Sequence, residues 1–175
     1  RKVGSVMEAV KIYDLREVDE LFFFDVSASL ENRTIDSNYI QEISKECFVP
    51  LCIGGGIKSI SSIEKLLKSG ADKVSINSQS IINKNFIKEA SETFGSQCIT
   101  VSIDYKIING MEQVYIKSGT HNTKIDLSDH VNEMESLGAG EIILTSIDRD
   151  GLMCGYDYST LKKIKSKINI PLVAS

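Results

Sequence analysis

The amino-acid sequence predicts an α/β fold, a (βα)8 TIM-type barrel that is incomplete, with residues 1–175 as one partial barrel domain. Apolar β-prone runs alternate with amphipathic segments, which is typical of right-handed βαβ units. Several of these runs end in Asp, Asn or Gly, as strands do at the mouth of a barrel. The segments VDELFFFD and GAGEIILTSID also resemble each other, as if one half-barrel had been duplicated. A doubly wound open sheet gives the same alternation, but its polar residues gather at one switch point.

The first half of the chain is expected to alternate helices and strands. Val6, Val10 and Tyr13 recur at helix spacing. Pro50 disfavours helix in the residue before it, and Gly70 is a typical helix stop. The predicted helices are Val6–Leu15, Asn38–Glu46 and Ser61–Ser69, and the predicted strands are Glu20–Val26, Leu51–Ile53 and Lys73–Ile76.

The second half continues the alternation and adds a hairpin. Asn109-Gly110 between two β-prone runs predicts a tight turn within residues 107–118. The predicted helices are Lys84–Phe94 (approximate bounds), Leu127–Leu137 and Tyr158–Ile168, and the predicted strands are Cys98–Asp104, Glu141–Ile147 and Pro171–Ala174. A complete barrel needs roughly 200–250 residues and eight strands, so with about six strands we expect the first and last to be missing.

Composition argues against several classes of function. The net charge of −4 disfavours a nucleic-acid-binding surface. No apolar run approaches the roughly 20 residues of a membrane span, so no membrane partner is expected. The four cysteines form no CxxC pair, which fits a reducing cytoplasm. His121 and His130 lack metal-ligand spacing, so neither a metal nor another cofactor is expected.

Two neighbouring segments predict a phosphate site. Gly54-Gly55-Gly56 follows a strand and precedes a helix, and glycines let backbone amides approach an anion closely. Asn77 and Ser78 end the next strand, where an amide and a hydroxyl would complete such a site. The alternatives are a tight strand-to-helix turn for the glycines and a helix cap for the polar pair. The glycine patterns of nucleotide-binding loops are absent, so a nucleotide is not indicated.

Asp25 and Asp104 follow apolar strands and are candidate acid–base residues. A partly desolvated carboxylate at a barrel mouth has a raised pKa and can move protons. For Asp25, which Ser27 follows, capping or pairing with a lysine is the stronger interpretation. Asp104 is the better candidate, because the hairpin after it supplies a loop to cover the site.

Residues 148–151 place mixed charge after a predicted strand. If the alternation of the strand continues, Asp148 and Asp150 share a direction and Arg149 opposes them. One of these residues is then a candidate for binding substrate hydroxyls, and the amide of Gly151 for binding a second phosphate. A structural salt-bridge cluster is the competing interpretation for Arg149.

Three charged residues lie at the opposite ends of predicted strands. Glu20, Lys73 and Glu141 enter apolar strands, where together they would form a ring of ion pairs across a barrel floor. For any one of them, a solvated rim charge is the simpler interpretation.

Longer motifs point to a family. The chain contains, in order, FFFDVSAS, IGGGI, GADKVSIN, FGSQCITVSID, SGTHNT, GAGEIILTSIDRDG and GYD. From Gly4 to Ser175 it resembles the cyclase subunit of imidazole glycerol phosphate synthase. The resemblance implies a (βα)8 barrel of two similar halves that forms a heterodimer with a glutaminase subunit. With ammonia from this partner, the family converts a bis-phosphorylated substrate, a phosphoribulosyl-formimino aminoimidazole carboxamide ribonucleotide, to imidazole glycerol phosphate, for histidine, and aminoimidazole carboxamide ribonucleotide.

The resemblance also implies roles for single residues. Asp104 matches the family's catalytic aspartate on the fifth strand, and Asp25 matches a position with a supporting role. Ser78 stands where the family often has Thr, which keeps the hydroxyl. The implied substrate and phosphate ligands are Gly56, Asn77, Ser78, Asp150 and Gly151, the implied ammonia gate is Glu20, Lys73 and Glu141, and Asp72 is implied at the partner interface.

The chain departs from the family pattern at its ends. The other catalytic aspartate belongs to the first strand, which would precede Arg1, and the rest of the second phosphate site would lie beyond Ser175. Gly4-Ser5-Val6 stands where the biosynthetic enzymes usually carry Gly-Asp-Pro. This difference keeps open a paralogous branch that amidates a sugar in surface-glycan synthesis. An alternative of another class is a noncatalytic partial barrel, inactive alone, that binds phosphate or docks a partner.

Overall fold

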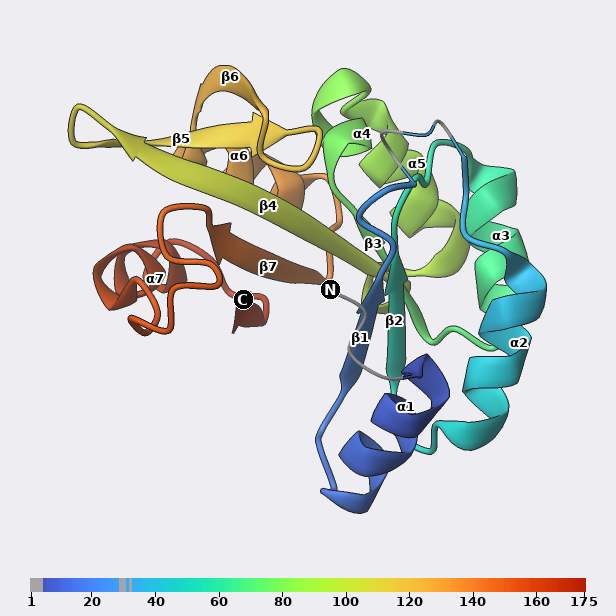
Figure 1. Cartoon of the computed structure of the whole chain (residues 1–175). Helices are drawn as coiled ribbons and strands as arrows, with labels where there is room; N and C mark the ends of the chain where they lie inside the picture. Colours follow the sequence, from blue (N-terminus) through green and yellow to red (C-terminus); the bar gives the residue numbers. More distant parts are fainter. Residues whose placement is uncertain (1–4, 29–30, 32) are drawn as a thin grey trace. The chain divides into compact units, whose positions relative to one another are not determined.

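The computed structural model describes residues 5–28, 31 and 33–175. The chain divides into two compact units, residues 1–75 and residues 76–175, and most of their elements are labelled in Figure 1. Gly4, where the departure from the family pattern begins, lies outside the described residues. Within the described ranges, none of the helices has the length and apolar character that crossing a bilayer requires.

The first unit is built from parallel strands and flanking helices. Its elements in chain order are α1 (Val6–Leu15), β1 (Leu21–Phe24), α2 (Ser37–Glu46), β2 (Leu51–Gly54), α3 (Ile60–Lys68) and the start of β3 (Lys73–Ile76). β1 pairs with β2 and β2 with β3, both in parallel, and all of β2 is buried as expected for a central parallel strand. Helices α2 and α3 lie side by side (Figure 1) and bury Ile40, Ile43 and Ile63 completely.

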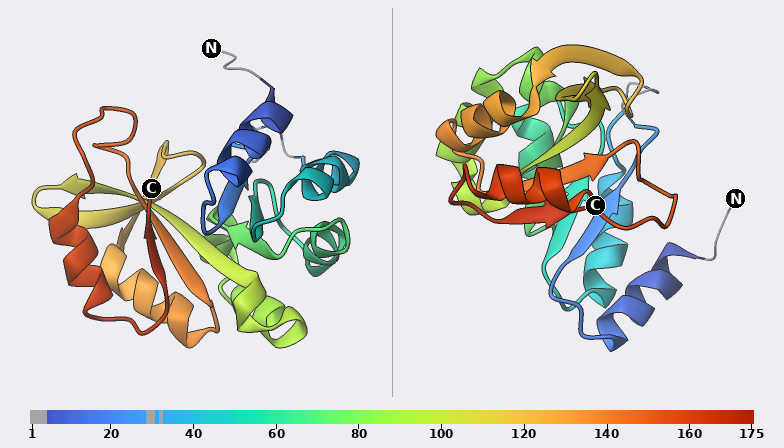
Figure 2. Two further views of the ribbon diagram at one scale, coloured as in Figure 1. Left: turned by 90° about the horizontal axis from the view of Figure 1, so that it is seen from below. Right: turned by 90° about the vertical axis from the view of Figure 1, so that its left-hand side faces the viewer.

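The second unit combines parallel strands with a long antiparallel hairpin. Its elements are α4 (Ser78–Ile82), α5 (Asn85–Phe94), the 3₁₀ turn η1 (Ser96–Cys98), β4 (Ile99–Ile108), β5 (Met111–Ile116), β6 (His121–Asp126), α6 (Leu127–Ser136), β7 (Glu141–Ser146), α7 (Tyr158–Lys165) and β8 (Leu172–Ala174). β4 pairs in parallel with β7, and β7 with β8. β4 also pairs antiparallel with β5, and β5 with β6. Figure 2 shows α6 and α7 side by side and the β4–β5 hairpin reaching outward.

Local chemistry accounts for the element boundaries of the second unit. Asp126 caps α6, because its side chain accepts the N–H groups of Ser128 and Asp129. Asn109 and Gly110 both have positive φ, 50° and 78°, which is the backbone that a two-residue hairpin turn requires. The predicted hairpin is therefore confirmed.

The predicted α/β class is confirmed, and the arrangement is consistent with an incomplete TIM barrel. β1, β2, β3, β4, β7 and β8 each have a parallel partner, and helices separate them along the chain. Every predicted helix is present within a few residues of its expected bounds. That residues 1–175 form a single partial barrel domain stays a prediction.

Three features of the second unit differ from the sequence prediction. β4 does not end at Asp104 but continues to Ile108, because its outer half forms a ladder with β5 from Asp104–Tyr115 to Ile108–Met111. α4, which has only five residues, was not among the predicted helices, although a helix cap at Asn77 and Ser78 was one of the alternatives considered. β6 lacks an apolar alternation and is a strand because it pairs with β5.

Candidate active site

Asp104 lies where two ladders of the second unit meet. It stands opposite Thr145 in the parallel pairing with β7 and opposite Tyr115 in the antiparallel pairing with β5. The side-chain amide of Asn77 donates a hydrogen bond to Asp104 Oδ2 at 3.1 Å. Burial and the nearby charge of Asp150 raise the pKa of Asp104, and the Asn77 hydrogen bond partly opposes them. A carboxylate with these properties is suited to proton transfer.

Asn77 and Ser78 follow β3 and begin α4. Asn77 occupies the N-cap position, but its side chain makes no capping hydrogen bond and is directed at Asp104 instead. The helix-cap alternative therefore does not account for its side chain. The hydroxyl of Ser78 accepts a hydrogen bond from the backbone N–H of Lys117 at 3.2 Å. The second unit thus brings together Asp104, its amide partner and the adjacent hydroxyl.

The mixed-charge segment after β7 is a turn rather than a continued strand. β7 ends at Ser146, whose carbonyl accepts the N–H groups of both Arg149 and Asp150, at 3.0 and 2.9 Å. The prediction that Asp148 and Asp150 share a direction by strand alternation was wrong, because the chain curls back on Ser146. Asp148 instead accepts the N–H of Ile107 at 3.2 Å, which ties the turn to the hairpin.

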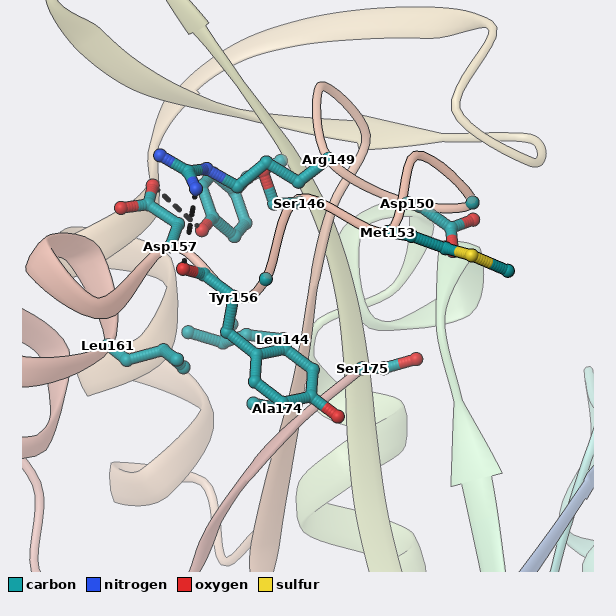
Figure 3. Close-up of a pocket in the computed structure, with 13 residues that line it drawn as sticks. Leu144, Ser146, Arg149, Asp150, Met153, Tyr156, Asp157, Leu161, Ala174 and Ser175 are labelled. Carbon is teal, nitrogen blue, oxygen red and sulfur yellow. Dashed lines mark hydrogen bonds between the residues drawn. The ribbon is translucent and has the colours of Figure 1, made fainter.

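This turn lines a cavity of about 450 Å³ within the second unit (Figure 3). Asp150 and Gly151 are on its wall, and Gly151 has a φ of 73°, with nothing within 4 Å of the position that a Cβ would occupy. The Arg149 guanidinium donates to the carbonyl of Tyr156 at 3.4 Å rather than serving a salt-bridge cluster. The implied substrate ligands Asp150 and Gly151 therefore face a space that can hold a ligand.

Sequence reasoning missed Asp157 and Tyr105 in the wall of this cavity. The Tyr105 hydroxyl donates to Asp157 Oδ2 at 3.1 Å, and burial raises the pKa of Tyr105 to about 12. Burial alone would raise the pKa of Asp157, but hydrogen bonds from Ser159 and Thr160 outweigh it and lower the pKa to about 2. The signal was available for Asp157, since it directly precedes the helix predicted from Tyr158, and Asp is a favoured N-cap residue.

In the first unit, Asp25 has the structural role that the sequence favoured. It accepts the Ser27 N–H at 3.1 Å, the Ser27 hydroxyl at 3.0 Å and the Ala28 N–H at 3.1 Å. Its cationic partner is Arg33 and not a lysine. The Arg33 hydrogen bond is the main cause of a lowered pKa for Asp25, against the effect of burial. Asp25 is therefore held as a charged carboxylate.

Tight packing also accounts for the glycines of the first unit. Gly55 and Gly56 have φ of 128° and 66°. A Cβ added to Gly56 would lie 2.0 Å from the carbonyl oxygen of Arg33, and one added to Gly55 would lie 2.5 Å from that of Asp25. The turn alternative thus explains why these positions carry glycine. Phosphate binding by Gly56 stays a prediction, as does its convergence with Ser78 and Asp104 on one site.

The charged residues at the opposite strand ends are buried or partly buried, so a solvated rim does not describe them. In the first unit, Lys73 Nζ lies 2.9 Å from Glu20 Oε2. In the second unit, Glu141 is 7% exposed and accepts a hydrogen bond from the Thr100 hydroxyl at 3.2 Å. Asp72 accepts the N–H of Leu51 at 2.8 Å, which fixes the start of β2. The part of the chain that the structure describes contains no metal-binding group of three or more His, Cys, Asp or Glu residues.

A parallel α/β fold that carries a partly buried carboxylate beside polar strand ends belongs to the class of barrel-type enzymes. Residues 1–175 match the family model described as histidine biosynthesis protein. The imidazole glycerol phosphate synthase subunit HisF of Lactococcus lactis subsp. cremoris strain MG1363 is 46% identical over 177 aligned residues. The corresponding HisF of strain SK11 is 45% identical, and each alignment covers 100% of this chain and 68% of the relative. The chain therefore belongs to the histidine biosynthesis family, as a HisF-type cyclase subunit, and the surface-glycan alternative is not favoured.

Proposed function

We propose that this chain performs the cyclase step of imidazole glycerol phosphate synthase, with Asp104 as a catalytic acid–base residue. The observation that carries the proposal is the Asp104 carboxylate itself, partly buried, with a raised pKa and a hydrogen bond from Asn77. The similarity to HisF subunits of imidazole glycerol phosphate synthase supports the reaction class. The histidine-pathway substrate is the bis-phosphorylated ribonucleotide that the family resemblance implies.

In the proposed mechanism, ammonia attacks the formimino carbon of the substrate. Formation of the new C–N bond leaves a positive charge on the nitrogen of the ammonia. A carboxylate base then removes a proton from this nitrogen. The same nitrogen then attacks the ribulosyl carbonyl carbon, and the ring closes with loss of that oxygen as water. Asp104 returns a proton to the departing nitrogen as the old bond between the formimino carbon and that nitrogen breaks. A raised pKa suits both directions, since it brings the carboxyl closer to the pH at which it takes up and releases a proton.

The two phosphates of the substrate would serve as anchors. As the family resemblance implies, the Ser78 hydroxyl and the Gly56 backbone amide would serve as phosphate ligands. The amide of Gly151, in the wall of the cavity, would serve the second phosphate. Asp150 would accept a hydrogen bond from a ribose hydroxyl. Held at both ends, the substrate reacts as if the step were intramolecular.

A glutaminase subunit is the expected partner, as the word "subunit" in the name of the relatives suggests. Glu20, Lys73 and Glu141 would belong to the ammonia gate, as the family resemblance implies. Asp72 would face the partner. A reducing cytoplasm is the proposed location.

The decisive assay uses the full-length protein with ammonium salts and the formimino ribonucleotide. We expect ammonia-dependent release of imidazole glycerol phosphate and aminoimidazole carboxamide ribonucleotide in equal amounts. Phosphate-dependent binding of the substrate with no release of either product would reject the enzyme and support the noncatalytic alternative.

A further inference from the structure

We propose that Ser80 and His130 are positioning residues of the active site, which hold Asn77 and, through it, the carboxylate of Asp104. The inference rests on the proposed catalytic role of Asp104. It concerns two buried residues of the second unit that neither the mechanism nor the family motifs use.

A chain of hydrogen bonds runs from α6 to β4. His130 Nε2 of α6 lies 3.3 Å from the Ser80 hydroxyl of α4. This hydroxyl lies 2.7 Å from the carbonyl oxygen of Asn77, which the Ser80 N–H also meets at 2.9 Å. Asn77 Nδ2 in turn donates to Asp104 Oδ2 at 3.1 Å. Each residue therefore contacts the next through a polar group.

The protons along this chain can be assigned. A serine hydroxyl has one proton, and in Ser80 it is donated to the carbonyl of Asn77. The Ser80 oxygen must then accept from His130, so that Nε2 carries the proton and Nδ1 does not. His130 Nδ1 is buried and has no hydrogen-bond partner among the described residues. The histidine has thus one polar contact, and it is directed at Ser80.

An apolar side chain would satisfy the packing of this position better than histidine does. His130 and Ser80 are each 1% exposed. A buried nitrogen without a partner typically costs about 1–3 kcal/mol. Burial is the main cause that lowers the pKa of His130 to about 4, with Lys84 acting in the same direction and Glu133 against it. The ring is therefore neutral near pH 7 and keeps its single donated hydrogen bond.

The effect on Asp104 follows from the position of Asn77. The carbonyl of Asn77 is held twice by Ser80, so its peptide cannot turn freely. The amide of Asn77 favours the charged form of Asp104, while burial and Asp150 favour the neutral form. When the Ser80 hydroxyl is lost, Asn77 is held less firmly, and the pKa of Asp104 rises further.

The test compares Ser80→Ala with Ser128→Ala in the full-length protein, assayed with ammonium salts. Ser128 is a matched control, because its hydroxyl is also buried in the second unit but has no hydrogen-bond partner among the described residues. For S80A we expect kcat to fall roughly threefold to tenfold, the equivalent of one hydrogen bond, with KM nearly unchanged. The limb of the pH–rate profile that belongs to Asp104 should move to higher pH. For S128A we expect neither change.

A second variant guards against loss of folding. His130→Phe keeps an aromatic ring and removes the Nε2 donor, while the bond from Ser80 to Asn77 remains. We expect a smaller fall in kcat than in S80A and a shift of the same pH limb in the same direction. If S80A does not fold, the test compares kcat and the pH–rate profile of H130F with those of S128A. The inference is overturned if S80A, or H130F in its place, lowers the melting temperature but leaves kcat and the pH limb as in S128A.

One further variant separates this outcome from failure of the proposed function. If Asp104→Asn retains full ammonia-dependent activity, the catalytic role of Asp104 is rejected and the positioning role falls with it. If D104N is inactive and S80A behaves as S128A, only the positioning role of Ser80 and His130 is rejected.

Discussion

The two units carry similar carboxylates in opposite environments. Asp25 in the first unit and Asp104 in the second both follow an apolar β-prone run, FFFD and VSID. Arg33, Ser27 and backbone amides surround Asp25 and lower its pKa, whereas burial and Asp150 raise the pKa of Asp104. Two carboxylates that each follow a β-prone run thus have pKa values shifted in opposite directions, and only Asp104 has the raised pKa that suits the proposed proton transfer. The neighbours of the side chain decide which role it has.

The largest expected effect is a difference in kcat between variants of the two carboxylates. In the full-length protein, Asp104→Asn should lower ammonia-dependent kcat by roughly 10²–10⁴-fold, because it removes the proton-transfer group. Asp25→Asn should leave kcat within about twofold, because the Asp25 carboxylate is engaged by Arg33, Ser27 and Ala28 and has a lowered pKa. Steady-state kinetics with substrate-binding controls would measure both. Equal losses in the two variants would contradict the division of roles.

The next effect concerns backbone space around glycines. Gly56→Ala should lower the free energy of unfolding by about 2–4 kcal/mol, since a positive φ and a close contact with the Arg33 carbonyl both penalise the methyl group. Gly110→Ala in the second unit has the same sign of φ but nothing within 4 Å, so it should cost only about 1–2 kcal/mol. Urea unfolding would compare them. If G56A lowers the free energy of unfolding less than G110A does, the backbone around Gly56 can move to accommodate the added methyl group.

Removing one of two ion pairs, one in each unit, should change the free energy of unfolding by smaller amounts. Lys73→Met leaves the partly buried Glu20 without its lysine and should lower the free energy of unfolding by about 1–2 kcal/mol. Lys163→Met removes a pair with Glu112 in which the lysine is 45% exposed, and should cost at most about 0.5 kcal/mol. Salt titration of the melting temperature offers a check, because only the exposed pair should be screened readily.

The smallest expected effect is on the melting temperature near pH 7, which D104N and D25N should change in opposite directions. A carboxyl with a raised pKa stabilises the fold fully below its unfolded pKa and loses this contribution as pH rises through its folded pKa. D104N should therefore melt a few degrees above the unsubstituted protein near pH 7, and the difference should vanish in acid. The pKa of Asp25 is lowered, so its contribution is present at neutral pH and lost as pH falls. D25N should accordingly melt lower near pH 7, and thermal scans from pH 3 to 8 would show whether the two signs differ.

Periodicity and turn chemistry predicted most of the fold. The helices bury apolar stripes such as Ile40 and Ile43, and the Asn109-Gly110 turn has the left-handed backbone that its residues favour. The missed strand β6 has no pattern of its own and depends on pairing with β5. Such elements arise from tertiary contacts, which no local signal encodes.

The candidate site was predicted less completely, for a related reason. The resemblance selected Asp104 and Asn77, and the structure brings them within hydrogen-bond distance. Ser80 and His130 carry no motif, because their relation exists only when α4 and α6 pack against each other. The resemblance also selected Asp150, but the direction that strand alternation predicted for it does not apply, because the chain turns back on Ser146.

The position of Asp104 at the meeting point of two ladders has a practical consequence. Hydrogen-bonded neighbours on both sides hold this stretch of β4, while a Cβ added to Gly110 at the far end of the hairpin would meet nothing within 4 Å. A fluorescent reporter or short peptide tag grafted between Asn109 and Gly110 would extend into solvent and leave the carboxylate in place. The hairpin tip is thus a suitable labelling site for following this protein during turnover.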